Sequence, residues 1–172
     1  MVYNCTIAEK GGGMGRMVIK KSFTIPKSIY AILLLGIFTF LFLGAEYLYV
    51  NMISLTAGEE KTVIAQNYAL GISAVGFLLY PLFHRLLKRR VQIVGLFILA
   101  LAAAVCNFLV QKHVSYSSTL LSGMTLFLFL GILGSAAHYL FFKLARDRTH
   151  LARMVGVSYA LGIFLQFLNN NL

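Results

Sequence analysis

Negative charge is scarce in this sequence. The 172 residues include only 5 Asp and Glu against 15 Lys and Arg; charged residues make up 12 % of the chain, and hydrophobic residues make up 59 %. A soluble domain has roughly 25 % charged residues because its surface faces water. The composition therefore excludes an ordinary soluble domain and predicts a membrane protein.

Cysteine is also scarce, and the residue groups that perform catalysis are missing. Cys5 and Cys106 stand far apart, so they indicate neither a disulfide framework nor a metal site. No Ser, His and acid stand at one membrane depth, and no glycine-rich phosphate loop precedes a Lys and a Ser or Thr. We expect no enzymatic activity, no cofactor and no metal.

Long hydrophobic runs dominate the rest of the chain. A membrane-spanning helix needs about 20 mostly apolar residues, and five stretches approach that length. The expected fold is all-α, a bundle of about five transmembrane helices within residues 28–172. The predicted spans are 28–53, 62–83, 91–110, 118–142 and 154–172.

Basic residues cluster between these runs and predict the orientation. One side of the membrane would hold Lys10, Arg16, Lys20, Lys21, Lys27, Arg85, Lys88, Arg89, Arg90, Lys143, Arg146, Arg148 and Arg153. The other side would hold Lys61 and Lys112. Because basic loops stay in the cytoplasm, we expect a cell-membrane protein with a cytoplasmic N-terminus. Short basic clusters between apolar runs indicate contact with anionic lipid and exclude nucleic acid as a partner.

The first 27 residues form a predicted basic cytoplasmic tail that contains "KGGGMGRM". Two interpretations remain open. Residues 1–13 are either a mis-assigned start upstream of the true initiator, at Met14 or Met17, or a flexible glycine-rich tail. Mass spectrometry of the native N-terminus distinguishes them, because a peptide that begins at Met1 excludes the first.

Small residues recur in the predicted spans at spacings that place them near one another on a helix. The fourth span contains Gly131, Gly134, Ser135 and Ala136, and the fifth contains Gly156, Ala160 and Gly162. Helices in lipid associate through close backbone contact, which small residues permit. The pattern predicts tight helix packing or, alternatively, the sliding surfaces of a transporter.

One carboxylate, Glu46, stands inside the first span. An acid at that depth costs roughly 2.5–3.5 kcal/mol on insertion scales, so such residues are usually shielded, paired or functional. Tyr49 follows at a three-residue spacing on the same helical face, and Gln66, Asn67 and Tyr68 start the second span at a similar depth. These residues predict a polar cluster that faces an outward-opening vestibule and binds a substrate or a proton. In the alternative, Glu46 extends to the interface and the two amides only begin a helix.

His138, in the fourth span, is a second candidate. Histidine exchanges a proton near neutral pH, so His138 could serve a proton-coupled step, or it could form an interfacial hydrogen bond. Other polar residues inside the spans are Asn51, Asn107, Tyr139, Ser158, Tyr159, Gln166 and Asn169.

The segment "YPLFHRLLKRR" between the second and third spans resembles the loop signature of the major facilitator superfamily. Leu82, Arg85 and the basic run Lys88, Arg89 and Arg90 are in register with that signature. Tyr80, His84 and Leu87 replace its first glycine, its acid and its second glycine. The stretches "AQNYALGISAVGFLLYP" and "ARMVGVSYALGIFLQFLNNN" are similar to the second and fifth helices of such transporters.

The resemblance implies a secondary active transporter that alternates between two open states, and a gating loop made of the hinge residues Tyr80, Leu82, His84, Arg85, Lys88, Arg89 and Arg90. The chain covers only about five helices of the first half, which predicts a truncated transporter. The substrate would be a small solute, with a proton or cation as coupling ion. The alternative is a small five-helix membrane protein that binds a partner subunit without transporting anything.

Overall fold

The computed structural model describes residues 27–112, 115–145 and 150–172, and within them the chain is helical with short connections and no strand. Residues 1–26 of the basic tail, Arg146 and Arg148 lie outside the described residues, whereas Lys27 begins α1. The helices are α1 (Lys27–Ala57), α2 (Glu59–Leu86), α3 (Arg89–Gln111), α4 (Tyr116–Leu144) and α5 (Leu151–Asn171). They follow the order of the five predicted spans and extend past the expected bounds by one to four residues, except that α5 ends one residue before its expected end.

The helices end where local chemistry favours a turn. Gly58 joins α1 to α2 with a φ of 79°, a left-handed conformation that glycine adopts without steric cost. Glu59 and Glu60 follow in the first turn of α2, where negative charge is favourable. At the start of α4, the backbone N–H of Ser118 donates to the Ser115 side chain over 3.3 Å, which is a typical N-cap.

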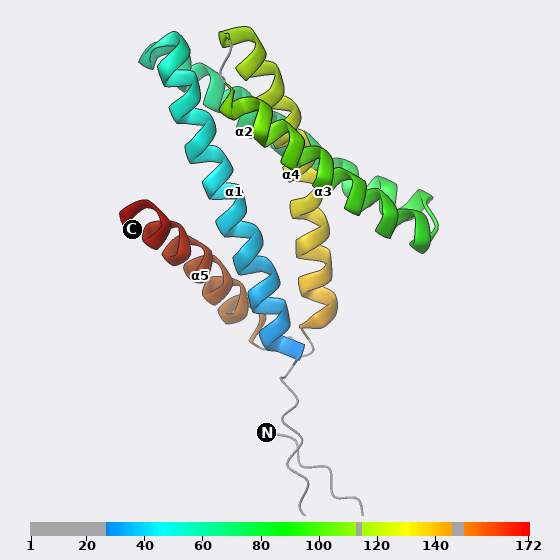
Figure 1. Cartoon of the computed structure of the whole chain (residues 1–172). Helices are drawn as coiled ribbons and strands as arrows, with labels where there is room; N and C mark the ends of the chain where they lie inside the picture. The colour runs from blue at the N-terminus through cyan, green and yellow to red at the C-terminus, as the bar shows by residue number, and fades with distance from the viewer. Residues whose placement is uncertain (1–26, 113–114, 146–149) are drawn as a thin grey trace, which may run out of the picture.

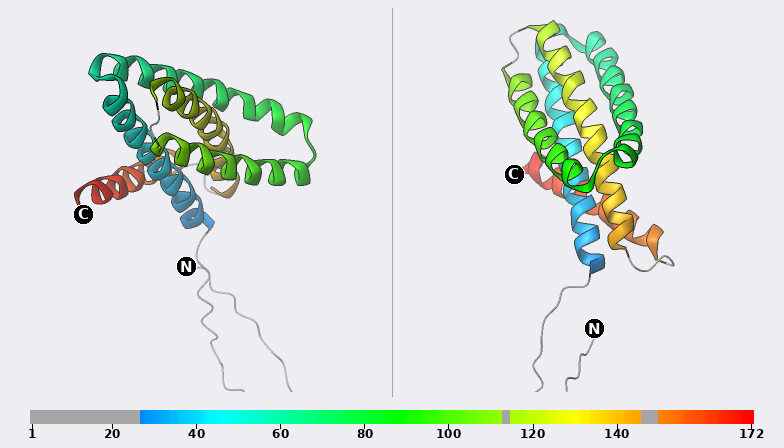
Figure 2. Two further views of the ribbon diagram at one scale, coloured as in Figure 1. Left: turned by 45° about the horizontal axis from the view of Figure 1, so that its top comes forward. Right: turned by 90° about the vertical axis from the view of Figure 1, so that its right-hand side faces the viewer.

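Helix α4 lies at the centre of the bundle, against α1, α2 and α3 (Figures 1 and 2). More than half of its most apolar segment is buried, a much larger share than in the other four helices. Its small residues explain this position: a Cβ at Gly131 would collide with the backbone of Ser73, and a Cβ at Gly76 would collide with the backbone of Leu128. Helices α2 and α4 therefore pack backbone against backbone, as the small-residue pattern predicts.

A second close crossing joins α5 to α1. A Cβ at Gly162 would lie 2.8 Å from the carbonyl oxygen of Gly36, and a Cβ at Gly36 would lie 3.1 Å from the carbonyl oxygen of Ser158. Helix α5 crosses α1 steeply, and the two helices diverge towards the C-terminus of α5 (Figures 1 and 2).

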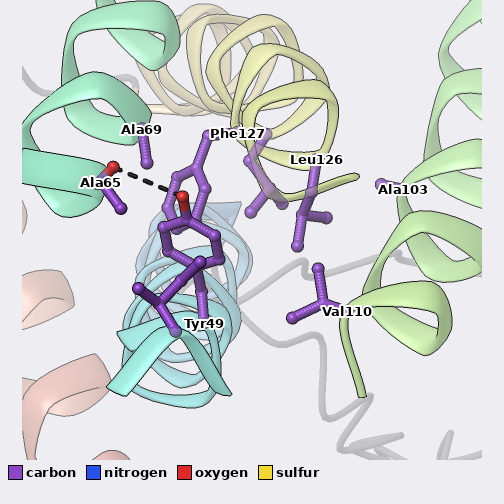
Figure 3. Close-up of a cluster of buried hydrophobic side chains, with 9 residues drawn as sticks. Tyr49, Ala65, Ala69, Ala103, Val110, Leu126 and Phe127 are labelled. Atoms are coloured by element: carbon purple, nitrogen blue, oxygen red, sulfur yellow. Dashed lines mark hydrogen bonds between the residues drawn. The ribbon is translucent and has the colours of Figure 1, made fainter. Parts of the chain in front are cut away.

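The largest buried cluster lies where α1, α2, α3 and α4 meet (Figure 3). Tyr49 and Phe127 are fully buried at its centre, with ring centroids 5.6 Å apart in an edge-to-face arrangement. Gly123 leaves room for the Tyr49 ring, because any Cβ there would collide with it. This cluster fixes the first four helices relative to one another.

The outer surface of the bundle is apolar. All five helices are long and apolar enough to cross a membrane, and large side chains such as Leu78, Phe97 and Leu121 are exposed by 65 % or more. Surfaces of this kind are unfavourable in water and favourable in lipid. The chain is therefore a membrane protein with five candidate membrane-spanning helices.

Candidate functional site

A pocket of about 420 Å³ opens between α1, α2 and α5, in the wedge where α5 diverges from α1. Its walls combine apolar side chains with one carboxylate and three carboxamides. The lining residues are Leu43, Glu46, Tyr47, Val50, Gln66, Ile163, Gln166, Phe167 and Asn170. Ligand sites in proteins are usually concave, mostly apolar and equipped with a few polar groups, as this pocket is.

Glu46 and Gln66 face each other across the pocket wall. The Nε2 of Gln66 donates a hydrogen bond of 2.9 Å to the Oε1 of Glu46, and both side chains are half-buried. The turn at Gly58 sets this pairing, because it folds the start of α2 back along the end of α1. Polar groups inside apolar helices need hydrogen-bond partners, so Gln66 both orients the Glu46 side chain and satisfies part of its hydrogen-bonding capacity.

Helix α5 adds Gln166 and Asn170 to the same pocket. Gln166 is only 8 % exposed, and its Nε2 donates to the Oδ1 of Asn170 over 3.1 Å. Its Oε1 is buried and has no hydrogen-bond partner among the described residues. A Cβ on Gly44 would lie 3.3 Å from this oxygen, so the carbonyl group lies against the bare backbone of α1.

Gln166 and Asn170 are not among the residues predicted for the site from the sequence. Gln166 is recognisable in the sequence as a polar residue within an apolar span. The sequence does not show, however, that this span packs beside α1. The arrangement of α5 against α1 depends on the Gly36 and Gly162 crossing, which the sequence alone does not pair.

The remaining members of the predicted polar cluster lie elsewhere. Tyr49 points into the buried cluster, where its hydroxyl donates to the carbonyl oxygen of Ala65 over 3.4 Å (Figure 3). Asn67 and Tyr68 are exposed on α2 and do not line the pocket. Of the five residues in the predicted cluster, the structure therefore brings only Glu46 and Gln66 together. The other three lie on different faces of their helices.

His138 lies outside the pocket, where it links α4 to α5. Its Nδ1 donates to the carbonyl oxygen of Gly134 over 2.7 Å, and its Nε2 lies 2.7 Å from the hydroxyl oxygen of Tyr159. In the neutral imidazole, Nε2 therefore accepts a hydrogen bond from the Tyr159 hydroxyl group. The Phe77 ring meets the imidazole edge-to-face at 5.4 Å. This arrangement matches the hydrogen-bonding alternative for His138 and leaves its role in proton coupling a prediction.

The hinge between α2 and α3 is held by Gln92. Its Nε2 donates to the carbonyl oxygens of His84 and Leu87, each over 2.7 Å, and its Oε1 accepts from the Nδ1 of His84 over 3.0 Å. Tyr80 is buried and stacks on the His84 ring, and Tyr139 of α4 approaches the same ring with a centroid distance of 4.3 Å. The other predicted gating residues are exposed: Leu82, Arg85, Lys88, Arg89 and Arg90.

In the described helices, no three His, Cys, Asp or Glu side chains lie close enough together to hold a metal ion. The chain matches no protein-family model, no curated protein and no solved structure. Its function must therefore be argued from the pocket itself.

Proposed function

We propose that the chain is a membrane transport protein, a secondary active transporter of the major facilitator type, that binds a small solute at Glu46. The observation that supports this most directly is the Glu46 carboxylate itself. It lies within a membrane-spanning helix, receives a 2.9 Å hydrogen bond from Gln66 and lines an open pocket. If Glu46 only extended to the membrane interface, a pocket of about 420 Å³ beside it would have no explanation.

The position of the pocket favours access from outside the cell. Glu46 lies in the second half of α1 and Gln66 in the first half of α2, towards the Gly58 connection and away from the basic hinge. With the basic hinge on the cytoplasmic side, the pocket opens towards the opposite side. Under this proposal a solute or a proton reaches Glu46 from outside, and a change of state re-exposes it to the cytoplasm.

The close crossing of α5 and α1 supports a moving part in this mechanism. Gly36 and Gly162 let the helices approach most closely at one point, and the pocket lies beyond it, where they diverge. Rocking of α5 about that point would widen or close the wedge without breaking the buried cluster around Tyr49 and Phe127. In the proposed transporter the hinge residues from Tyr80 to Arg90 act as the gating loop, with the exposed basic side chains near lipid phosphates.

The proposal is tested by the variant Glu46→Gln in the full chain, reconstituted in liposomes. We expect loss of solute-dependent proton or cation flux, because glutamine keeps the hydrogen-bonding shape but removes the charge. Glu60→Gln is the matched control: Glu60 is exposed in the first turn of α2 and does not line the pocket. Unchanged flux in Glu46→Gln excludes the pocket from transport.

A second candidate function follows from the limited support of α5. Among the described helices, α5 comes close in backbone to α1 alone. Its contacts with α4 are made by side chains: Met154 shares a small buried cluster with Phe141, and Tyr159 lies within hydrogen-bond distance of His138. Its Val157 and Phe164 are exposed and lie outside the pocket, as the contact surface for a partner subunit would. Co-purification of a stoichiometric membrane partner from native cells, with no flux by the chain in liposomes, would favour this function.

A further inference from the structure

We propose that the ligand of the Glu46 pocket has a primary ammonium group and a short apolar body, and that Gln166 accepts one of its N–H hydrogens. This inference rests on the proposed function, since it names the substrate class of the same site. It depends on three features of the pocket: its charge, its acceptor oxygens and its apolar wall.

The charge of the pocket selects a cation. Glu46 is the only acidic side chain among the nine lining residues, and none of them is Lys, Arg or His. In the low dielectric between membrane helices, an unpaired carboxylate is costly and a bound cation offsets that cost. An anionic ligand would meet like charge with nothing to balance it.

The acceptor oxygens select a cation that can donate hydrogen bonds. Gln66 uses one acceptor position of the Glu46 carboxylate, and a carboxylate has about four such positions, so most of its capacity remains. Gln166 provides a carbonyl oxygen that is buried and has no partner within the described residues. A primary ammonium group has three N–H donors and can satisfy both residues at once.

The neighbours of Gln166 leave its carbonyl oxygen available to a ligand. Its Nε2 is engaged with the Oδ1 of Asn170, which leaves the carbonyl oxygen as the group without a partner. The Gln166 side chain itself lines the pocket, so its unpartnered oxygen belongs to a residue that a bound ligand would contact. A ligand N–H would remove the cost of leaving a buried acceptor unsatisfied.

The remaining wall selects an organic cation over a bare metal ion. Leu43, Val50, Ile163 and Phe167 line the pocket together with the ring of Tyr47. A volume of about 420 Å³ exceeds what an ion needs and lies in the usual range for organic ligands. Aromatic rings also attract an ammonium group.

The test measures binding calorimetrically with the full chain in lipid nanodiscs, with empty nanodiscs as the blank. The probe is phenethylammonium. Its comparators are phenethyltrimethylammonium, which is a cation without N–H donors, and 2-phenylethanol, which is neutral. The variants are Glu46→Gln, Gln166→Met, which keeps the length of the side chain, and Asn169→Leu, an exposed position on α5 outside the pocket.

We expect phenethylammonium to bind more tightly than either comparator. Glu46→Gln should weaken its binding by about a hundredfold and Gln166→Met by about tenfold, as expected for the loss of a charged pair and of one charge-assisted hydrogen bond. Asn169→Leu should bind as the unmodified chain does. Gln166→Met should leave phenethyltrimethylammonium binding unchanged, because that cation has no N–H for Gln166 to accept.

Two results overturn the inference. The first is equal binding of the primary and trimethylated amines by the unmodified chain, a comparison that needs no variant to fold. The second is an equal loss for both amines in Gln166→Met, which would mean that Gln166 only shapes the pocket. If Glu46-dependent flux persists in liposomes in either case, the transport proposal stands and only the ligand class is wrong. If the amine binds as expected but no flux is seen, the ligand class stands and the transport proposal fails.

Discussion

Replacing Gly131 by alanine inserts a methyl group at the point where α4 crosses α2. The added Cβ would collide with the carbonyl oxygen of Ser73, and would also lie 2.9 Å from its carbonyl carbon and 3.0 Å from the backbone nitrogen of Phe77. All three atoms belong to the backbone of α2, so no side-chain rotation relieves the contact. The two helices must separate, and the packing around the crossing must loosen.

The expected cost follows from this geometry. Overpacking in a close-packed interior costs about 1–3 kcal/mol, and the higher helix propensity of alanine offsets roughly 1 kcal/mol of it. Gly71→Ala is the matched control, because a Cβ at Gly71, on the exposed side of α2, has nothing within 4 Å. Both variants gain the same helix propensity, so their difference isolates the overpacking of about 1–3 kcal/mol.

The measurement is thermal unfolding of the purified chain in detergent, followed by far-ultraviolet circular dichroism because the chain has no tryptophan for fluorescence. We expect Gly131→Ala to melt about 3–10 °C below Gly71→Ala, on the usual relation between free energy and melting temperature at this size. Equal melting temperatures for the two variants would refute the backbone contact between α2 and α4.

Three further predictions concern the hinge, the core and the orientation. Gln92→Leu removes the donor to two backbone carbonyls at the end of α2, so hydrogen exchange in that turn should accelerate by about tenfold, while the exposed substitution Val91→Leu should leave it unchanged. Tyr49→Phe loses only a 3.4 Å hydrogen bond to Ala65, so the free energy of unfolding, measured by denaturation in detergent, should fall by less than about 1 kcal/mol. A larger fall would mean that this hydrogen bond is stronger than its length indicates. Arg85→Cys should react with a membrane-impermeant maleimide only after the cells are opened, and labelling in intact cells contradicts the cytoplasmic hinge.

The candidate site was partly visible in the sequence. Glu46 and Gln66 were singled out by their polarity within apolar runs, and the short connection at Gly58 made their proximity foreseeable. Tyr49 was grouped with them because a three-residue spacing places two side chains on one side of a helix. That spacing still leaves them about 60° apart, enough for Tyr49 to enter the buried cluster while Glu46 lines the pocket.

The sequence by itself determined the five helices and their apolar surfaces, because each long apolar run must satisfy its backbone hydrogen bonds internally within lipid. It also marked the small residues that allow helices to touch. Only the tertiary structure decided which helices touch and where. The crossing of Gly162 on Gly36 sets the angle of α5 against α1, and that angle creates the pocket and brings Gln166 to it. Such pairings depend on shape between distant segments, which local patterns of polarity do not encode.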